Sequence, residues 1–177
     1  MKIYCYLCTL IMVKIKEKDI IEAAQKGSEA FVDLFAERIL ADIGGELTAD
    51  TMQQLTADQI TLLAYQTIKG EVMEGGFIQL IHNGYGPFIF LNPFAKAMRL
   101  WGAKMFSKLV YDGRELYEKH GEALTRECTD EEFMALYEQY ERFDKLDEKF
   151  IDMEEEVTNI VAHYIDEHLD SFAIIEK

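Results

Sequence analysis

Residues 129–164 read TDEEFMALYEQYERFDKLDEKFIDMEEEVTNIVAHY and contain neither glycine nor proline. The first four residues, TDEE, form the Thr-x-x-Glu pattern of a capping box, which predicts the start of a helix. Apolar residues then recur at helical spacing in residues 133–143 and again in residues 150–164, with a break expected near residues 144–147. The stretch therefore predicts two consecutive amphipathic helices and an all-α fold class.

The residues before this stretch predict four more helices, which span about residues 17–41, 57–73, 92–101 and 103–120. Gly27 weakens the middle of the first, and Thr56 with Gln59 forms a capping box at the start of the second. The tetrapeptide Leu-Thr-Ala-Asp at residues 47–50 recurs at residues 55–58, and both copies are typical of helix starts. The helices are expected to form an irregular multi-helix bundle.

A glycine-rich corner is predicted after the second of these helices. Gly75 and Gly76 permit a positive φ or close packing, so they favour a chain reversal, and Phe77 is expected to be its buried anchor. Asn83 and Gly84 are expected to form the next turn, tied by the Asn side chain. The alternative left open is a ligand pocket at this corner, with polar contacts from Gln79, His82 and Asn83.

Shorter signals lie on either side of the fourth predicted helix. Residues 88–91 are predicted to be a short strand or simply a buried run. Asn92 and Pro93 are typical of an N-cap and the first residue of a helix. Gly121 stands where the cap of the last helix of this group is expected.

The N-terminal residues 3–13 form an apolar run that is too short to span a bilayer. Lysines follow the run instead of preceding it, so a secretory signal is not indicated and a cytoplasmic location is expected. Two interpretations of residues 1–16 stay open. They form a short strand or arm that packs on the helices, or translation begins at Met12 and the start at Met1 is over-called. In either case one helical domain is expected within residues 1–177.

The net charge of −15 is distributed unevenly along the chain. Residues 1–114 contain 13 acidic and 12 basic residues, whereas residues 115–177 contain 20 acidic and 6 basic residues. The densest part is residues 127–156, with 13 acidic and 3 basic residues. Such a field repels nucleic acids and anionic membranes and attracts basic partners. Direct binding to DNA, RNA or a membrane surface is therefore not expected.

The sequence does not predict a catalytic, cofactor or metal site. Cys5 and Cys8 form a lone Cys-x-x-C pair, without the two further ligands at matching spacing that zinc requires. Glu71, Glu74 and His82 lack the Glu-x-x-His partners of carboxylate metal bundles, so a solvated helix face is the simpler interpretation. The chain contains no nucleophile elbow, P-loop or dinucleotide fingerprint. A binding protein is expected rather than an enzyme.

Carboxylates three or four residues apart on a helix have Cβ atoms about 5–6 Å apart. This separation is close to that of neighbouring phosphates along a DNA strand, so a helical array of acids can resemble a DNA backbone. The alternative is that the acids only confer solubility. The predicted partner-binding acidic face consists of Glu127, Asp130, Glu131, Glu132, Glu138, Glu141, Asp144, Asp147, Glu148, Asp152, Glu154, Glu155 and Glu156.

Residues 71–86, EVMEGGFIQLIHNGYG, and residues 95–104, AKAMRLWGAK, resemble a bacterial family of DNA-mimic proteins that was formerly a family of unknown function. Residues 143–150, FDKLDEKF, are also similar, and the resemblance covers roughly residues 50–172. The turn at residues 85–93 is longer and more apolar than in the family. The resemblance implies a helical structural motif formed by Gly75, Gly76, Phe77, Gln79, Asn83 and Gly84.

The resemblance also implies an acidic dimer that occupies the DNA-binding face of a transcription factor. Together with the charge distribution, it predicts that carboxylates of residues 127–156 bind the basic face of a bacterial regulator or nucleoid protein. The alternative is an immunity-type or regulatory partner protein that neutralises a basic toxin. A homodimer is expected to bury the less charged half of the chain, where residues 3–13 and 88–91 are apolar.

Overall fold

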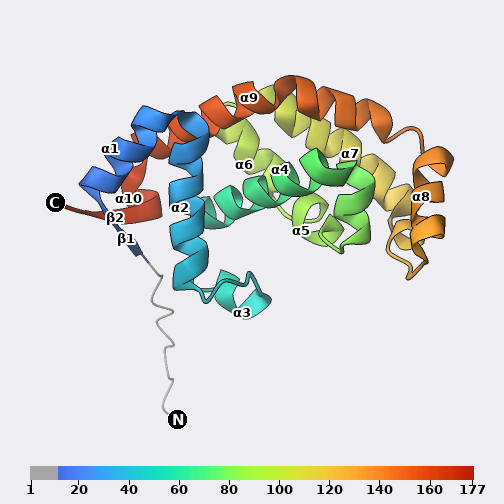
Figure 1. Cartoon of the computed structure of the whole chain (residues 1–177), viewed down its shortest axis with the longest axis horizontal. Helices are drawn as coiled ribbons and strands as arrows, with labels where there is room; N and C mark the ends of the chain where they lie inside the picture. The colour runs from blue at the N-terminus through green and yellow to red at the C-terminus, as the bar shows by residue number, and fades with distance from the viewer. Residues whose placement is uncertain (1–11) are drawn as a thin grey trace, which may run out of the picture. The chain divides into compact units, whose positions relative to one another are not determined.

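The computed structural model describes residues 12–177, and Figure 1 shows that these residues are almost entirely helical. The all-α class expected from the sequence is confirmed. The elements, in chain order, are β1 Val13–Lys16, α1 Glu17–Lys26, α2 Ser28–Asp42, α3 Ala49–Met52, α4 Ala57–His82, α5 Gly86–Phe90, α6 Phe94–Leu100, α7 Lys104–Leu124, α8 Asp130–Gln139, α9 Asp144–Glu167, α10 Leu169–Phe172 and β2 Ala173–Glu176.

The chain forms two compact units. Among the described residues, the first unit comprises residues 12–63 and 162–177, and the second comprises Ala64–Val161. The long helices α4 and α9 each contribute residues to both units. The single-domain organisation expected from the sequence stays a prediction.

In the first unit, strands from the two ends of the chain pair in parallel, with Val13 opposite Ala173. Val13 and Ile15 point into the core, while the lysines between and after them are exposed. The strand expected near the N-terminus is thus confirmed for Val13–Lys16, and the rest of the predicted arm lies outside the described residues. The sequence did not predict β2, because an isolated run of four residues gives no periodic signal.

The single helix predicted at residues 17–41 is wrong in one respect, because Gly27 divides it into α1 and α2. Gly27 has a φ of 116° and a ψ of 175°, a conformation that fits glycine and ends a helix. The capping box of Thr56 and Gln59 is confirmed, with backbone-to-side-chain distances of 2.9 and 3.0 Å. The same two side chains donate to the carbonyl oxygens of Ser171 and Phe172, each at 2.9 Å, so they fasten the start of α4 to the segment before β2.

The second unit is organised around aromatic side chains. The rings of Phe77 and Phe106 both contact Phe150 of α9, with centroid distances of 6.2 and 5.9 Å. Phe77 also stacks on Phe90 of α5 at 6.3 Å, and Tyr65 meets the edge of Phe106 at 5.9 Å. All five side chains are almost fully buried. This cluster therefore joins α4, α5, α7 and α9, and the buried anchor predicted at Phe77 is confirmed.

The glycine corner is a kink inside α4. Gly75 has φ −151° and ψ 21°, and Gly76 has φ 73° and ψ −177°, so neither residue is helical. A kink leaves backbone groups without their helical partners. The Phe77 N–H donates to an Asp147 carboxylate oxygen at 2.8 Å, and the Tyr137 hydroxyl donates to the Gly75 carbonyl at 2.8 Å. Side chains of α8 and α9 thus supply hydrogen-bond partners for two backbone groups at the kink of α4.

Other boundaries also differ from the sequence expectation: the helix predicted at residues 92–101 begins at Phe94, with Pro93 and not Asn92 as its N-cap residue. Residues 88–91 belong mostly to helix α5 instead of a strand, because Pro87 sits in its first turn and sets a helical φ. Gly121 lies inside α7, where a side chain would collide with the Tyr117 ring, so it serves packing rather than capping. The break before the last long helix falls at residues 140–143, because Phe143 turns into the core before α9 begins.

Replacing Gly76 by alanine is expected to lower the free energy of unfolding by at least about 1 kcal/mol. Its φ of 73° is strained for alanine, and the new Cβ would lie only 2.4 Å from the Asp147 carboxylate. Gly70→Ala is the matched control, because Gly70 lies within α4 with open space around it. That variant should gain about 0.5–1 kcal/mol from helix propensity. Urea unfolding measures the free energy of unfolding of each variant. Equal changes of the same sign in the two variants would contradict the assigned role of Gly76.

Candidate functional site

The predicted acidic face lies on α8, α9 and the residues that flank them, all within the second unit. Helix α8 starts with a capping box in which Thr129 and Glu132 exchange hydrogen bonds of 3.2 and 2.8 Å. Asp130 and the two following glutamates occupy its first turn, where the helix dipole favours negative charge. Helix α9 buries Leu146, Phe150 and Val157, so its remaining positions are available for charge.

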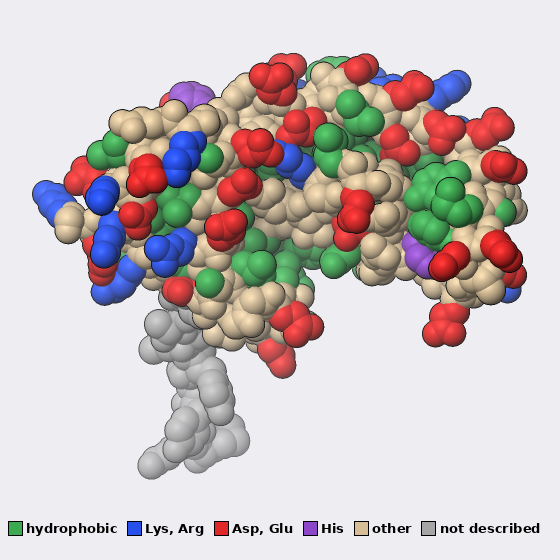
Figure 2. Space-filling view, viewed as in Figure 1, with side chains coloured by type: hydrophobic (Ala, Val, Ile, Leu, Met, Phe, Trp, Pro, Cys, Tyr) green, Lys and Arg blue, Asp and Glu red, His purple; other side chains and the backbone are tan. Residues whose placement is uncertain are grey.

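Four exposed carboxylates lie on the side of α9 opposite its buried residues. With 3.6 residues per turn, the positions of Asp144, Glu148, Asp152 and Glu155 fall on one face of the helix. We call these four residues the α9 stripe. They are separated by four, four and three residues, so the stripe extends about 16 Å along the helix. Figure 2 shows acidic side chains along the outer edge of α9 and around α8.

The carboxylates of the α9 stripe have no basic side chain within ion-pair distance among the residues that the structure describes. The three basic residues of the acidic segment lie together beside α7, with Lys145 and Lys149 on the flank of α9 and Arg142 just before α9 begins. Arg142, Lys145 and Lys149 line one cavity there, of about 290 Å³, and Lys149 approaches Asp112 at 3.8 Å. Asp112 and Glu115 of α7 line the same cavity, so the basic residues face carboxylates of α7 and leave the stripe without a neutralising partner.

Glu154, which the sequence placed in the acidic face, belongs to a partly buried polar network instead. Its carboxylate lies 2.7 Å from the Lys69 ammonium and accepts a hydrogen bond of 2.8 Å from Thr158. The Thr158 hydroxyl also lies 2.7 Å from that of Tyr65. Burial alone would raise the pKa of Glu154, but the bonds from Lys69 and Thr158 and the Lys69 charge together hold it below its ordinary value. This carboxylate is already paired, and the sequence offered no sign of its Lys69 partner.

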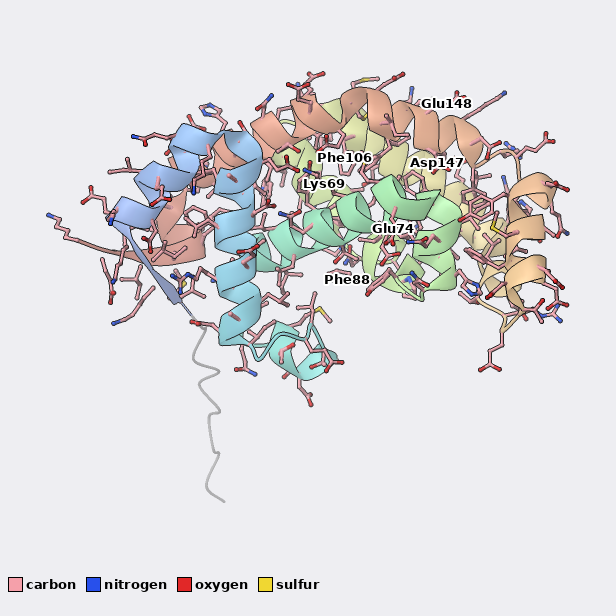
Figure 3. All side chains as sticks on the ribbon, viewed as in Figure 1. Lys69, Glu74, Phe88, Phe106, Asp147 and Glu148 are labelled. Atoms are coloured by element: carbon pink, nitrogen blue, oxygen red, sulfur yellow. The ribbon has the colours of Figure 1, made fainter. Side chains whose placement is uncertain are left out.

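Asp147 is the second carboxylate of the predicted face that points inward. Figure 3 shows Asp147 on the side of α9 toward the kink of α4, and Glu148 on the outer side. Burial raises the pKa of Asp147 to about 6, against the hydrogen bond from the Phe77 N–H, and the nearby Asp144 charge adds to the increase. Burial also raises the pKa of Tyr137, with a contribution from the charge of Asp147. Asp147 therefore holds the kink and is not free to meet a partner.

The remaining residues of the predicted acidic face are exposed in two further groups. The first group surrounds the start of α8 and comprises Glu127, Asp130, Glu131 and Glu132. In the second, Glu138 and Glu141 line a cavity of about 610 Å³ beside His120 and Tyr140. Glu156 is also exposed, on the flank of the α9 stripe. Sequence reasoning missed His120, because nothing in the sequence links α7 to the end of α8.

The amide side chains of the corner motif bind two glutamates of α4. Gln79 donates to the carboxylates of Glu71 and Glu74 at 3.3 and 3.2 Å. Asn83 donates to Glu71 at 2.8 Å instead of tying the next turn, which corrects the sequence expectation. Gly84 has the positive φ of 85° that this turn requires. The amide groups are thus engaged within α4, which favours a structural motif over a ligand pocket.

His82, the third polar residue of the alternative pocket, is also engaged. Its Nδ1 lies 2.9 Å from the Leu124 carbonyl oxygen, and its ring lies 4.6 Å from that of Phe133 in α8. Within residues 12–177, no group of three or more His, Cys, Asp or Glu side chains could hold a metal ion. No helix in this range is long and apolar enough to cross a membrane. Cys5 and Cys8 lie outside the described residues, and Cys128 is an exposed free thiol.

The sequence profile of a family described as DMP19-like protein matches residues 53–168. The chain belongs to this family. The matched range contains the kink of α4 and the whole α9 stripe, and it confirms the family expected from the sequence. A related protein, DNA mimic protein DMP19 of Neisseria meningitidis serogroup B, is 33% identical over 127 residues. The alignment covers 71% of this DMP19-like chain and 77% of the relative.

Replacing Asp147 by asparagine is expected to raise the stability of this DMP19-like protein at neutral pH. The Asn side chain can still accept from the Phe77 N–H but carries no charge to bury. Because the folded-state pKa of Asp147 is raised, its contribution to stability is present below about pH 4 and is lost as the pH rises through about 6. The advantage of Asp147→Asn should therefore grow by roughly 1–2 kcal/mol between pH 4 and pH 7, less than the full linkage value because the carboxylate is partly exposed.

The measurement is a pair of urea unfolding curves, for parent and variant, at several pH values in this interval. Subtracting the two free energies removes the titration of the other carboxylates. A difference that stays constant with pH would contradict the burial of an ionised Asp147.

Proposed function

We propose that this protein is a DNA mimic that occupies the DNA-binding face of a basic bacterial protein, either a transcription regulator or a nucleoid protein. The observation that carries the proposal is the α9 stripe, a row of four exposed carboxylates without ion pairs in the described residues. It occurs in a member of the DMP19-like family, and the related protein named above is itself described as a DNA mimic.

The spacing of the stripe suits a surface that binds DNA. Such surfaces position the duplex mainly through Lys and Arg side chains that contact successive phosphates. The α9 stripe offers one negative charge about every 5–6 Å along a straight helix. The exposed carboxylates at the start of α8 and at Glu138 and Glu141 extend the negative surface beyond α9. A row of basic side chains can therefore pair with the protein much as it pairs with a phosphate backbone.

The arrangement of charge favours recognition over solubility as the role of these acids. Carboxylates four residues apart on a helix repel each other, at a cost of about 0.2–0.5 kcal/mol per pair. A surface that served only solubility would be expected to intersperse both signs. Here Lys145 and Lys149 lie on the flank toward α7, and the outer face of α9 is left acidic.

On this proposal the protein acts by binding alone, in the cytoplasm where its partner works, and it needs no metal, cofactor or catalytic residue. Nor does it bind nucleic acid or a membrane, because its field repels both. The segment that contacts the partner is α8 and α9, and the kink of α4 holds that segment in place.

Reversing charge on the α9 stripe is expected to abolish partner binding. The variant carries Glu148→Lys, Asp152→Lys and Glu155→Lys. These three side chains are exposed and make no hydrogen bond or ion pair among the described residues. The partner is a DNA-binding protein retained by the immobilised protein from a lysate of the encoding bacterium, and affinity is then measured with the purified pair. We expect at least about a hundredfold loss, since three favourable charge contacts become repulsive. The parent affinity should also fall steeply with salt.

The matched control carries Glu37→Lys, Asp42→Lys and Glu46→Lys, which change the net charge equally on the exposed surface of the first unit. Its affinity should stay within about tenfold of the parent, because only long-range attraction is lost. Equal losses in the two variants would show that net charge, and not the α9 stripe, drives binding. A basic nuclease as the retained partner would instead support the toxin-neutralising alternative.

A homodimer is part of the proposal. Two chains of charge −15 repel each other, so association must use less charged surface. Of the apolar segments expected to take part, residues 3–11 lie outside the described residues and Val13 is buried in β1, whereas Leu91 is 55% exposed just after α5. Leu91→Glu should therefore convert a dimer into a monomer in light scattering. A parent protein that is monomeric at high concentration would contradict the dimer.

A further inference from the structure

We propose that the cavity where α8 meets α9 receives an arginine side chain of the partner. This inference rests on the proposed function and names one contact within it. The cavity has a volume of about 610 Å³ and is lined on one side by residues 138–143, where the chain leaves α8 and enters α9. His120 of α7 also lines the cavity. This volume is within the range of ligand sites, and it exceeds what one side chain requires.

The lining suits a planar cation better than a neutral or anionic group. Glu138 and Glu141 are exposed carboxylates without ion pairs among the described residues. The rings of Tyr140 and His120, which line the same cavity, lie 5.1 Å apart at 55°, so aromatic faces occur beside the two carboxylates. A guanidinium group can stack on an aromatic face while its N–H groups pair with carboxylates.

The same geometry distinguishes arginine from lysine. A lysine ammonium is a compact, strongly hydrated point charge that cannot stack as a plane or bind a carboxylate through two parallel N–H groups. Arginine is also the residue most often used where proteins read DNA, at base edges as well as at phosphates. A protein that takes the place of DNA would therefore meet arginines of its partner, and this cavity offers a site for one.

Arg142 opposes a cation in this cavity, because it lies in the lining between Glu141 and Phe143. It also lines the neighbouring cavity of about 290 Å³ with Lys145 and Lys149. Arg142 thus stands at the boundary between an acidic and a basic surface. Removing its charge should make the acidic cavity more attractive to a guanidinium, whereas removing Glu138 and Glu141 should make it less so.

The test uses the full chain and three capped tripeptides, Gly-Arg-Gly, Gly-Lys-Gly and Gly-citrulline-Gly, followed by NMR. The arginine peptide should shift the resonances of His120 and Tyr140 saturably. The lysine peptide should bind at least about threefold more weakly, and the citrulline peptide, which keeps the shape without the charge, should not shift them. Citrulline binding equal to arginine binding, lysine binding equal to arginine binding, or no saturable shift at these residues would each overturn the assignment.

Variants connect the cavity to the partner. Glu138→Gln with Glu141→Gln should weaken both arginine peptide and partner by about fivefold or more, and Arg142→Gln should strengthen both. The matched control is Glu37→Gln with Glu46→Gln, which removes the same charge from exposed positions of the first unit and should change peptide binding less than about twofold. Equal effects of the two double variants on the peptide would overturn the cavity site.

The two proposals fail separately. Charge reversal in the α9 stripe could abolish partner binding while replacement of Glu138 and Glu141 has no specific effect. That result would support the DNA-mimic function and overturn the arginine site. Specific binding of the arginine peptide by a protein that retains no DNA-binding partner would support an arginine site in the cavity and overturn the DNA-mimic function.

Discussion

The hydrogen bond from the Phe77 N–H to Asp147 holds the second unit in the form on which its acidic surface depends. The kink at Gly75 and Gly76 frees this N–H from α4 and turns Phe77 toward the aromatic core. In the same region Tyr137 binds the Gly75 carbonyl from α8. Both acidic helices are thus fastened to one point of α4. The fastening fixes the rotation of α9, and that rotation decides which carboxylates face outward.

This anchoring accounts for two kinds of carboxylate on one helix. Asp147 and Glu154 lie on the flank of α9 toward α4, where one satisfies the kink and the other pairs with Lys69. The residues next to them in sequence, Glu148 and Glu155, lie on the outer face and pair with nothing among the described residues. Inward acids are therefore engaged in hydrogen bonds and ion pairs within the unit, and outward acids remain available to a partner. The family motif and the acidic surface are consequently parts of one arrangement, although they are far apart in the sequence.

Much of the fold follows from local signals in the sequence. Thr56 and Thr129 start helices as their capping boxes predict, and Phe77, Phe143 and Phe150 are buried as their positions suggest, whereas the apolar face predicted for α8 contains no fully buried residue. The pairing of distant segments could not be predicted from the sequence, because β2 is a four-residue strand whose partner lies at the other end of the chain. The division of the α9 carboxylates into inward and outward groups could have been predicted from the sequence. Projecting residues 144–156 on a helix separates Asp147 and Glu154 from the α9 stripe, since both fall about 60–80° beyond the edge of the stripe at Asp144. The partners of those two acids could not be predicted, because they depend on how α4 packs.

The central claim is that the α9 stripe takes the place of DNA, so the decisive measurement is competition between this protein and duplex DNA for the same partner. A labelled duplex bound to the partner is titrated with this protein, and fluorescence anisotropy is followed together with the mass of the complex. The account predicts that this protein displaces the duplex completely from the partner. Its apparent affinity for the partner should fall as the concentration of free duplex rises, and no complex should contain this protein, the partner and the duplex together. A stable ternary complex that leaves the duplex bound at saturating protein would contradict it.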